Sequence, residues 1–197
     1  MKAGFEVATL VVGARGAGQD RAAVIDAGAE LWIALADGAG GTGGGDVAAD
    51  AVVASLATIG NDLLAHVAAL DDPRVLGGGQ TTAVVLRVGA GAIVGASVGD
   101  SVAWLVGADG IVELTGAQRR KPLLGSGEAR VTPFEHGAWS GTLLVASDGL
   151  ASYVRRADVV ATLAAAGDLA VAAQRLVELV RLASGGLPDD VSIVLVR

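Results

Sequence analysis

The sequence contains no cysteine, and this absence removes several kinds of functional site. Without a thiol the chain can form no disulfide, no thiolate zinc site and no cysteine nucleophile. Histidine is nearly as scarce, because His66 and His136 are the only two and lie far apart in the sequence. A metal site in this chain would therefore consist of oxygen ligands, which suit Mg²⁺, Mn²⁺ or Ca²⁺.

Positive charge is also in short supply. The chain has 14 Lys and Arg against 21 Asp and Glu, which gives a net charge of −7. A protein that binds nucleic acid usually presents a basic stripe, so we expect no nucleic-acid partner. The negative charge by itself indicates no more than good solubility.

Long hydrophobic runs are missing, although 52% of the residues are hydrophobic. The longest, such as residues 31–36 and 143–146, are far shorter than the ~20 residues that cross a bilayer. The first residues, 1–6, lack the pattern of a signal peptide. We therefore expect a cytoplasmic protein with no membrane partner. Its 197 residues contain no evident linker, which predicts a single domain over residues 1–197.

Glycine, in contrast, is abundant, with 30 residues, many of them between short apolar segments. This pattern predicts about ten strands that are joined mostly by tight turns and are therefore mostly antiparallel. The expected strands are residues 5–12, 21–26, 30–36, 81–88, 92–98, 102–106, 111–114, 129–134, 141–146 and 191–196.

Two longer segments show helical periodicity. In residues 46–70 the apolar positions recur at spacings of three and four, with Asp46 as the expected N-cap. A second amphipathic helix should follow its N-cap Asp168, and short helical pieces are expected in residues 150–165. Because the strands cluster away from the helices, these elements predict an α+β fold with antiparallel sheets rather than a doubly wound parallel sheet.

Five acidic residues lie where an apolar segment meets a glycine, serine or proline. Antiparallel strands can bring such ends to one rim of a sheet, where clustered carboxylates repel each other unless cations hold them. Two Mg²⁺ or Mn²⁺ ions would suit such a cluster and could activate a water for attack on phosphorus. For any one of these residues taken alone, a simple turn is the better explanation, and only the set as a whole favours a metal site. The five residues are Asp20, Asp37, Asp100, Asp148 and Asp189.

The glycine-rich stretch after Asp37 permits another interpretation. Residues 38–43 match the G-x-G-x-x-G pattern of dinucleotide-binding folds, between an expected strand and an expected helix. The match is weak in a chain so rich in glycine. Asp37 would also repel a pyrophosphate, and its strand follows a hairpin instead of opening a βαβ unit.

Six short motifs, in this order, resemble those of the metal-dependent protein serine/threonine phosphatases, the PPM or protein phosphatase type 2C family, in their compact bacterial form. Each motif is weak alone, whereas the ordered set is specific and spans nearly the whole chain. The motifs are Arg15-x4-Asp20-Arg21, Ala36-Asp37-Gly38-x-Gly40-Gly41, Gly78-Gly79-Gln80-Thr81-Thr82, Val98-Gly99-Asp100-Ser101, Ala146-Ser147-Asp148-Gly149-Leu150 and Asp189-Asp190-Val191-Ser192.

The resemblance implies a four-layer α-β-β-α sandwich, in which two antiparallel sheets are flanked by helices. It also implies a binuclear Mg²⁺ or Mn²⁺ centre at one end. Asp37 should bridge the two ions, and Gly38 should offer its carbonyl oxygen. Asp148 and Asp189 should hold one ion, while Asp20 should lie beside the other and act through water.

The family pattern assigns further roles and also shows where this chain departs from it. Arg15 should grip the substrate phosphate, which makes Arg15 and Asp37 the candidate catalytic residues. Asp100, together with Asp148, is the candidate ligand of a third, weaker ion. However, an aspartate that often completes that third site is Ser152 here. The flap segment, residues 114–125, is also short, and its basic residues are either solvated or in contact with substrate.

Two functions follow from the resemblance. The first is an active phosphatase that hydrolyses phosphoserine or phosphothreonine in a protein, opposing a bacterial Ser/Thr kinase or acting on a phosphorylated regulator. The second is a catalytically weak relative that serves as a regulatory or binding module. The retained carboxylates favour the active enzyme, because an unneeded cluster of buried charge would destabilise the fold.

Overall fold

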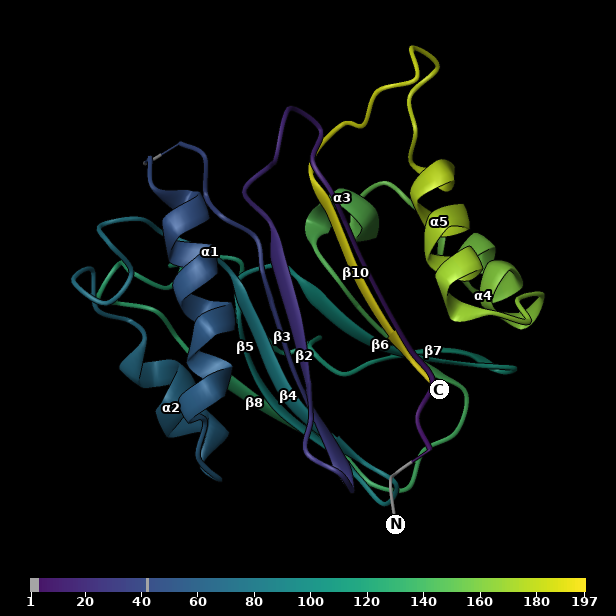
Figure 1. The fold of residues 1–197 in the computed structure, drawn as a ribbon, viewed down its shortest axis with the longest axis horizontal. Helices are drawn as coiled ribbons and strands as arrows, with labels where there is room; N and C mark the ends of the chain where they lie inside the picture. Colours follow the sequence, from purple (N-terminus) through teal and green to yellow (C-terminus); the bar gives the residue numbers. More distant parts are fainter. Residues whose placement is uncertain (1–3, 42) are drawn as a thin grey trace.

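The computed structural model describes residues 4–41 and 43–197, so that Thr42 of the glycine-rich loop lies outside the described residues. Two antiparallel sheets pack face to face, and helices cover the outer face of each (Figure 1). The predicted four-layer α-β-β-α arrangement is confirmed. None of the helices in the described part of the chain is long and apolar enough to span a bilayer.

Each sheet has five strands, and all the strand pairs are antiparallel. The predicted strands agree with the observed ones to within a few residues at their ends. The first sheet has the order β1 (Val7–Val12), β10 (Val191–Val196), β9 (Thr142–Ala146), β6 (Val102–Gly107) and β7 (Gly110–Glu113). The second has the order β2 (Arg21–Asp26), β3 (Glu30–Ala36), β4 (Ala83–Gly89), β5 (Ile93–Val98) and β8 (Thr132–His136).

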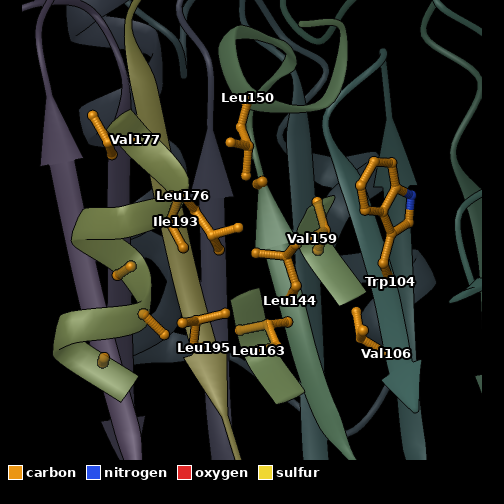
Figure 2. Packing of buried hydrophobic residues seen from close by; sticks show 14 of the residues in the cluster. Trp104, Val106, Leu144, Leu150, Val159, Leu163, Leu176, Val177, Ile193 and Leu195 are labelled. Atoms are coloured by element: carbon orange, nitrogen blue, oxygen red, sulfur yellow. The ribbon is translucent and has the colours of Figure 1, made fainter. Parts of the chain in front are cut away.

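The strand β10 shows why some strands are continuous apolar runs in the sequence. All of its residues are buried, because one face packs against helices and the other against the second sheet. Successive side chains of a strand point to opposite faces. Ile193 and Leu195 accordingly join the helix-facing core (Figure 2), whereas Val194 and Val196 join the core between the sheets.

The helical segment predicted for residues 46–70 is broken into three pieces. These are α1 (Gly45–Ala54), a 3₁₀ turn (Ser55–Thr58) and α2 (Leu63–Ala69). The break falls at residues 59–62, where Asp62 caps α2 by accepting a hydrogen bond from the Ala65 N–H at 2.9 Å. Asp46 is not the N-cap of α1. That position belongs to Gly44, whose φ of 70° is left-handed and favours glycine.

The helices on the other side agree with prediction. They are α3 (Asp148–Ala151), α4 (Arg156–Ala164) and α5 (Leu169–Leu179). Asp168 caps α5 as expected, because its carboxylate accepts a hydrogen bond from the Val171 N–H at 2.9 Å. The amphipathic face of α5 buries Leu176 against β10 (Figure 2).

The dinucleotide interpretation of the glycine stretch is not supported by this topology. The strand β3 lies between β2 and β4 and is antiparallel to both. A dinucleotide fingerprint belongs to the first turn of a parallel βαβ unit, and β3 does not open one.

Candidate active site

Strand register brings the predicted carboxylates to one rim of the sandwich. In the second sheet Arg21 pairs with Ala36, so that Asp20 and Asp37 flank the last rung of the β2–β3 ladder. In the first sheet Ala146 pairs with both Val102 and Ile193. The end of β9 and the starts of β6 and β10 therefore lie side by side, which places Asp148 near Asp100 and Asp189.

These residues surround a cavity of about 410 Å³. Asp20 does not line this cavity and is only 1% exposed. A larger cavity of about 640 Å³ lies elsewhere, between α2 and strands β5 and β8, but its lining is mostly apolar. The predicted site residues that line the smaller cavity are Asp37, Gly38, Asp100, Asp148 and Asp189.

The carboxylates are in an environment that opposes their ionisation. Burial raises the pKa of Asp37 to about 9, and the charges of Asp20, Asp148 and Asp189 act in the same direction. Burial also raises the pKa of Asp20 to about 6, although the nearby hydroxyls of two serines act against it. Burial raises the pKa of Asp148 as well. A bound cation would reverse all three shifts.

The donor set fits hard divalent ions. Asp20 has a buried Oδ2 with no hydrogen-bond partner among the described residues, which is a cost unless a ligand meets that atom. Among the described residues, no group of three acidic or histidine side chains is arranged to hold a single metal ion. This is compatible with Mg²⁺, which is usually held by one or two carboxylates and keeps several waters.

Asp37 is held by its backbone from the Gln-Thr-Thr motif. The Thr82 N–H donates to the Asp37 carbonyl at 2.9 Å, and the Thr81 hydroxyl donates to the same oxygen at 2.8 Å. The Asp37 N–H in turn donates to the Thr82 hydroxyl at 3.0 Å. The next residue, Gly38, must be glycine because a Cβ there would collide with the carbonyl of Gly45 at the start of α1.

The Ser-Asp-Gly motif fixes Asp148 to the start of β10. The Ser147 N–H donates to the Ser192 carbonyl at 3.1 Å, and the Ser192 N–H donates to the Ser147 hydroxyl at 2.9 Å. A Cβ on Gly149 would collide with the Asp190 carbonyl. The glycine therefore permits the close contact that keeps Asp148 beside Asp189.

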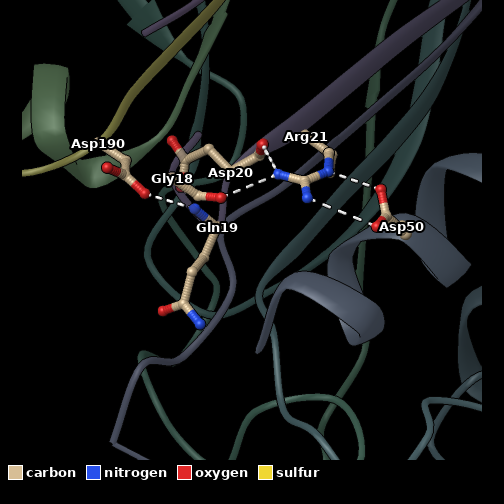
Figure 3. Close-up of polar contacts among 6 residues, drawn as sticks. All are labelled: Gly18, Gln19, Asp20, Arg21, Asp50 and Asp190. Atoms are coloured by element: carbon tan, nitrogen blue, oxygen red, sulfur yellow. Dashed lines mark hydrogen bonds and ion pairs between the residues drawn. The ribbon is translucent and has the colours of Figure 1, made fainter. Parts of the chain in front are cut away.

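The loop that carries Arg15 is anchored by Asp190, which is not among the site residues predicted from the sequence. The Asp190 carboxylate accepts a hydrogen bond from the Ala14 N–H at 2.7 Å. It accepts another from the Gln19 N–H at 2.6 Å (Figure 3). Arg15 is exposed and lines a second cavity, which Asp189 and Asp190 also line. The only sequence signal for this role is the position of Asp190 directly after a candidate ligand.

Arg21 is the second residue whose contribution the sequence did not reveal. Its guanidinium donates to the Asp20 carbonyl at 2.8 Å and to the Gly18 carbonyl at 3.2 Å. It also pairs with Asp50 of α1, at 2.6 Å (Figure 3). Arg21 thus fixes the turn that delivers the buried Asp20 carboxylate to the rim.

The basic flap segment faces the carboxylates. Arg120 and Lys121 both line the cavity. The Arg120 guanidinium donates to one oxygen of Asp100, from Nε at 2.9 Å and from Nη2 at 2.7 Å. Arg120 and Lys121 therefore lie at the candidate site, and their contact with a substrate stays a prediction.

Comparison with known proteins gives a likeness in structure. No family model matches the sequence, and no curated protein sequence is significantly similar to it. A bacterial serine phosphatase shares 20% identity and a TM-score of 0.82, over 98% of this chain and 97% of its own. Stp1, a serine/threonine phosphatase from Staphylococcus aureus, shares 19% identity and a TM-score of 0.80, over 100% and 96%.

The catalytic domain of the serine/threonine protein phosphatase PstP was solved in complex with two manganese ions. It shares 25% identity with this chain and a TM-score of 0.74, over 98% of this chain and 97% of that domain. The likeness thus covers nearly the whole chain in each comparison. The chain has the fold of the bacterial serine/threonine phosphatases of the PPM, or type 2C, family, as its motifs predict.

Proposed function

We propose that the protein is a metal-dependent serine/threonine phosphatase that hydrolyses phosphoserine and phosphothreonine in proteins. One observation carries the proposal. Asp37 is held among Asp20, Asp148 and Asp189, and its pKa is raised to about 9. In a fold shared with serine/threonine phosphatases, such mutually repelling carboxylates are best explained as ligands for cations.

The residues present fit two Mg²⁺ or Mn²⁺ ions. Asp37 would serve both ions, and Gly38 would offer its carbonyl oxygen. Asp148 and Asp189 would hold one ion, and Asp20 would support the other through water. The two manganese ions of the PstP complex support this assignment. Bound ions would neutralise the charge of the phosphoryl group and supply an activated water.

Arg15 would bind the substrate phosphate. A guanidinium presents two parallel N–H groups that match a phosphate. The side chain is exposed at the edge of the rim, and its loop is fixed at both ends by Asp190. Arg15 is therefore free to meet a phosphorylated side chain that enters from solvent. The natural substrate would be the product of a protein Ser/Thr kinase.

The direct test is hydrolysis of an aryl phosphate by the purified protein. We expect turnover with Mn²⁺ or Mg²⁺ and none in EDTA, with recovery when the metal is restored. Phosphoserine and phosphothreonine peptides should be substrates under the same conditions. Equal turnover in EDTA would contradict the proposal. Binding of Mn²⁺ without turnover of any of these substrates would favour the regulatory module instead.

Substitution Arg15→Ala should raise KM for a phosphopeptide roughly ten- to hundredfold, because a hydrogen bond to a charged group contributes about 1.5–3 kcal/mol. The value of kcat should change less, since Arg15 contributes to binding in both the ground and transition states. Arg155→Ala is a suitable control, because Arg155 is a highly exposed arginine that pairs with Asp158 and lines neither cavity. An unchanged KM in Arg15→Ala would mean that this side chain does not bind the substrate phosphate.

A further inference from the structure

Asp100, the candidate ligand of a third ion, already has a cationic partner. Its Oδ2 accepts two hydrogen bonds from the Arg120 guanidinium, at 2.9 Å and 2.7 Å. The Asp100 side chain is 25% exposed and Arg120 is 75% exposed, so the guanidinium meets the carboxylate from the solvent side. An ion that bound this oxygen would have to displace the guanidinium.

Arg120 also shares a cavity with Asp148, since Arg120, Asp100 and Asp148 all line it. The guanidinium thus places one positive charge at the cavity that holds both carboxylates assigned by the resemblance to a third ion.

The remaining ligand position contributes no charge that would help a third ion to compete with the guanidinium. Ser152 stands where the family often has an aspartate, and it ends α3 with its N–H donating to the Asp148 carbonyl at 2.8 Å. A neutral hydroxyl there leaves two carboxylates for the third site, and one of them is paired. Hard divalent ions prefer several carboxylate or carbonyl oxygens.

We propose that Arg120 takes the place of a third divalent ion in this protein. The site would then bind two ions, and the flap segment, residues 114–125, would be tethered to it by a guanidinium instead of a metal. The inference rests on the proposed two-ion phosphatase. The positive charge at the flap would then come from the Arg120 side chain, so no third ion would have to be taken up from solution.

The test is the number of Mn²⁺ ions bound per chain, measured by equilibrium dialysis with metal analysis and by titration calorimetry at low ionic strength. Wild type should bind two ions. Arg120→Ala should bind a third, more weakly, because Asp100 is released. Asp100→Asn combined with Arg120→Ala should return to two. Arg119→Ala is the matched control, since it removes the same charge from the adjacent residue, which does not line the cavity, and it should bind two.

The outcomes separate this inference from the proposed function. A third ion in wild type that is lost in Asp100→Asn would overturn the inference and leave the two-ion phosphatase intact. So would Arg120→Ala with no additional ion, provided that its circular dichroism and thermal melting match those of wild type. A wild-type chain that binds no Mn²⁺ would overturn the proposed function and this inference with it.

Discussion

The Asp37→Asn variant is expected to lose metal-dependent phosphatase activity by roughly a hundred- to thousandfold or more, the scale seen when one preorganised electrostatic group is removed from an active site. A loss of this size is expected because Asp37 would serve both of the proposed ions. An amide binds divalent ions more weakly than a carboxylate and cannot neutralise their charge.

The same substitution should make the metal-free protein more stable. Asp37 is half-buried beside three other carboxylates, and these surroundings raise its pKa to about 9 and so disfavour its charge in the metal-free fold. Asparagine is nearly the same size and carries no charge. Each 1 kcal/mol gained would raise the Tm by about 2–4 °C for a chain of this size. A loss of activity accompanied by a gain in Tm distinguishes a functional carboxylate from a structural one.

The matched control is Asp109→Asn. Asp109 is exposed in the turn between β6 and β7, at the end of β6 remote from the rim, and it lines neither site cavity. This variant should keep both activity and Tm. Full activity in Asp37→Asn, or a lower Tm in EDTA, would contradict the assignment of Asp37 to the metal centre.

The second large effect is on stability as a function of pH. In EDTA the protein should become less stable as the pH rises from about 4 to about 9. The pKa values of Asp37 and Asp20 in the folded protein, about 9 and about 6, lie above their ordinary value of 3.8. The folded state therefore binds more protons than the unfolded state in this window, so the free energy of unfolding falls as the pH rises.

Divalent ions should stabilise the protein with the opposite dependence on pH. Metal ligands must be deprotonated, so the ion competes with the proton on Asp37 and binds more tightly as the pH rises to about 9. At a hundredfold excess over Kd, binding would add about 2.7 kcal/mol. The measurement is Tm with EDTA and with Mn²⁺ across this pH range. A metal-induced change in Tm that does not vary with pH would contradict the assignment.

Much of the fold could be predicted because its signals are local. The strands β2, β3 and β10 have the expected bounds, since glycine turns or aspartates mark their ends in the sequence. The placement of Asp37 and Asp148 follows from the same pattern, in which a buried strand ends at an acidic residue and a glycine. Once the strands pair as antiparallel neighbours, the register carries these residues to one rim.

The parts that could not be predicted depend on contacts between distant segments. Asp190 lies more than 170 residues from the loop that it anchors, so no local pattern marks it. The pairing of Arg120 with Asp100 depends on how the flap folds back over the rim. The apolar spacing of residues 46–70 predicts one continuous helix, whereas the chain breaks at residues 59–62. Apolar spacing alone does not indicate where a helix ends.

The double anchor at Asp190 has a mechanical consequence. Asp189 is the proposed ion ligand and Asp190 holds the Arg15 loop at Ala14 and Gln19, so a single peptide unit joins the two functions. A displacement of Asp189 towards an ion would shift the attachment point of that loop. Binding of the ion and binding of phosphate by Arg15 would then be thermodynamically linked, and such linkage is reciprocal. A phosphate bound by Arg15 would raise the affinity for the ion by the same factor.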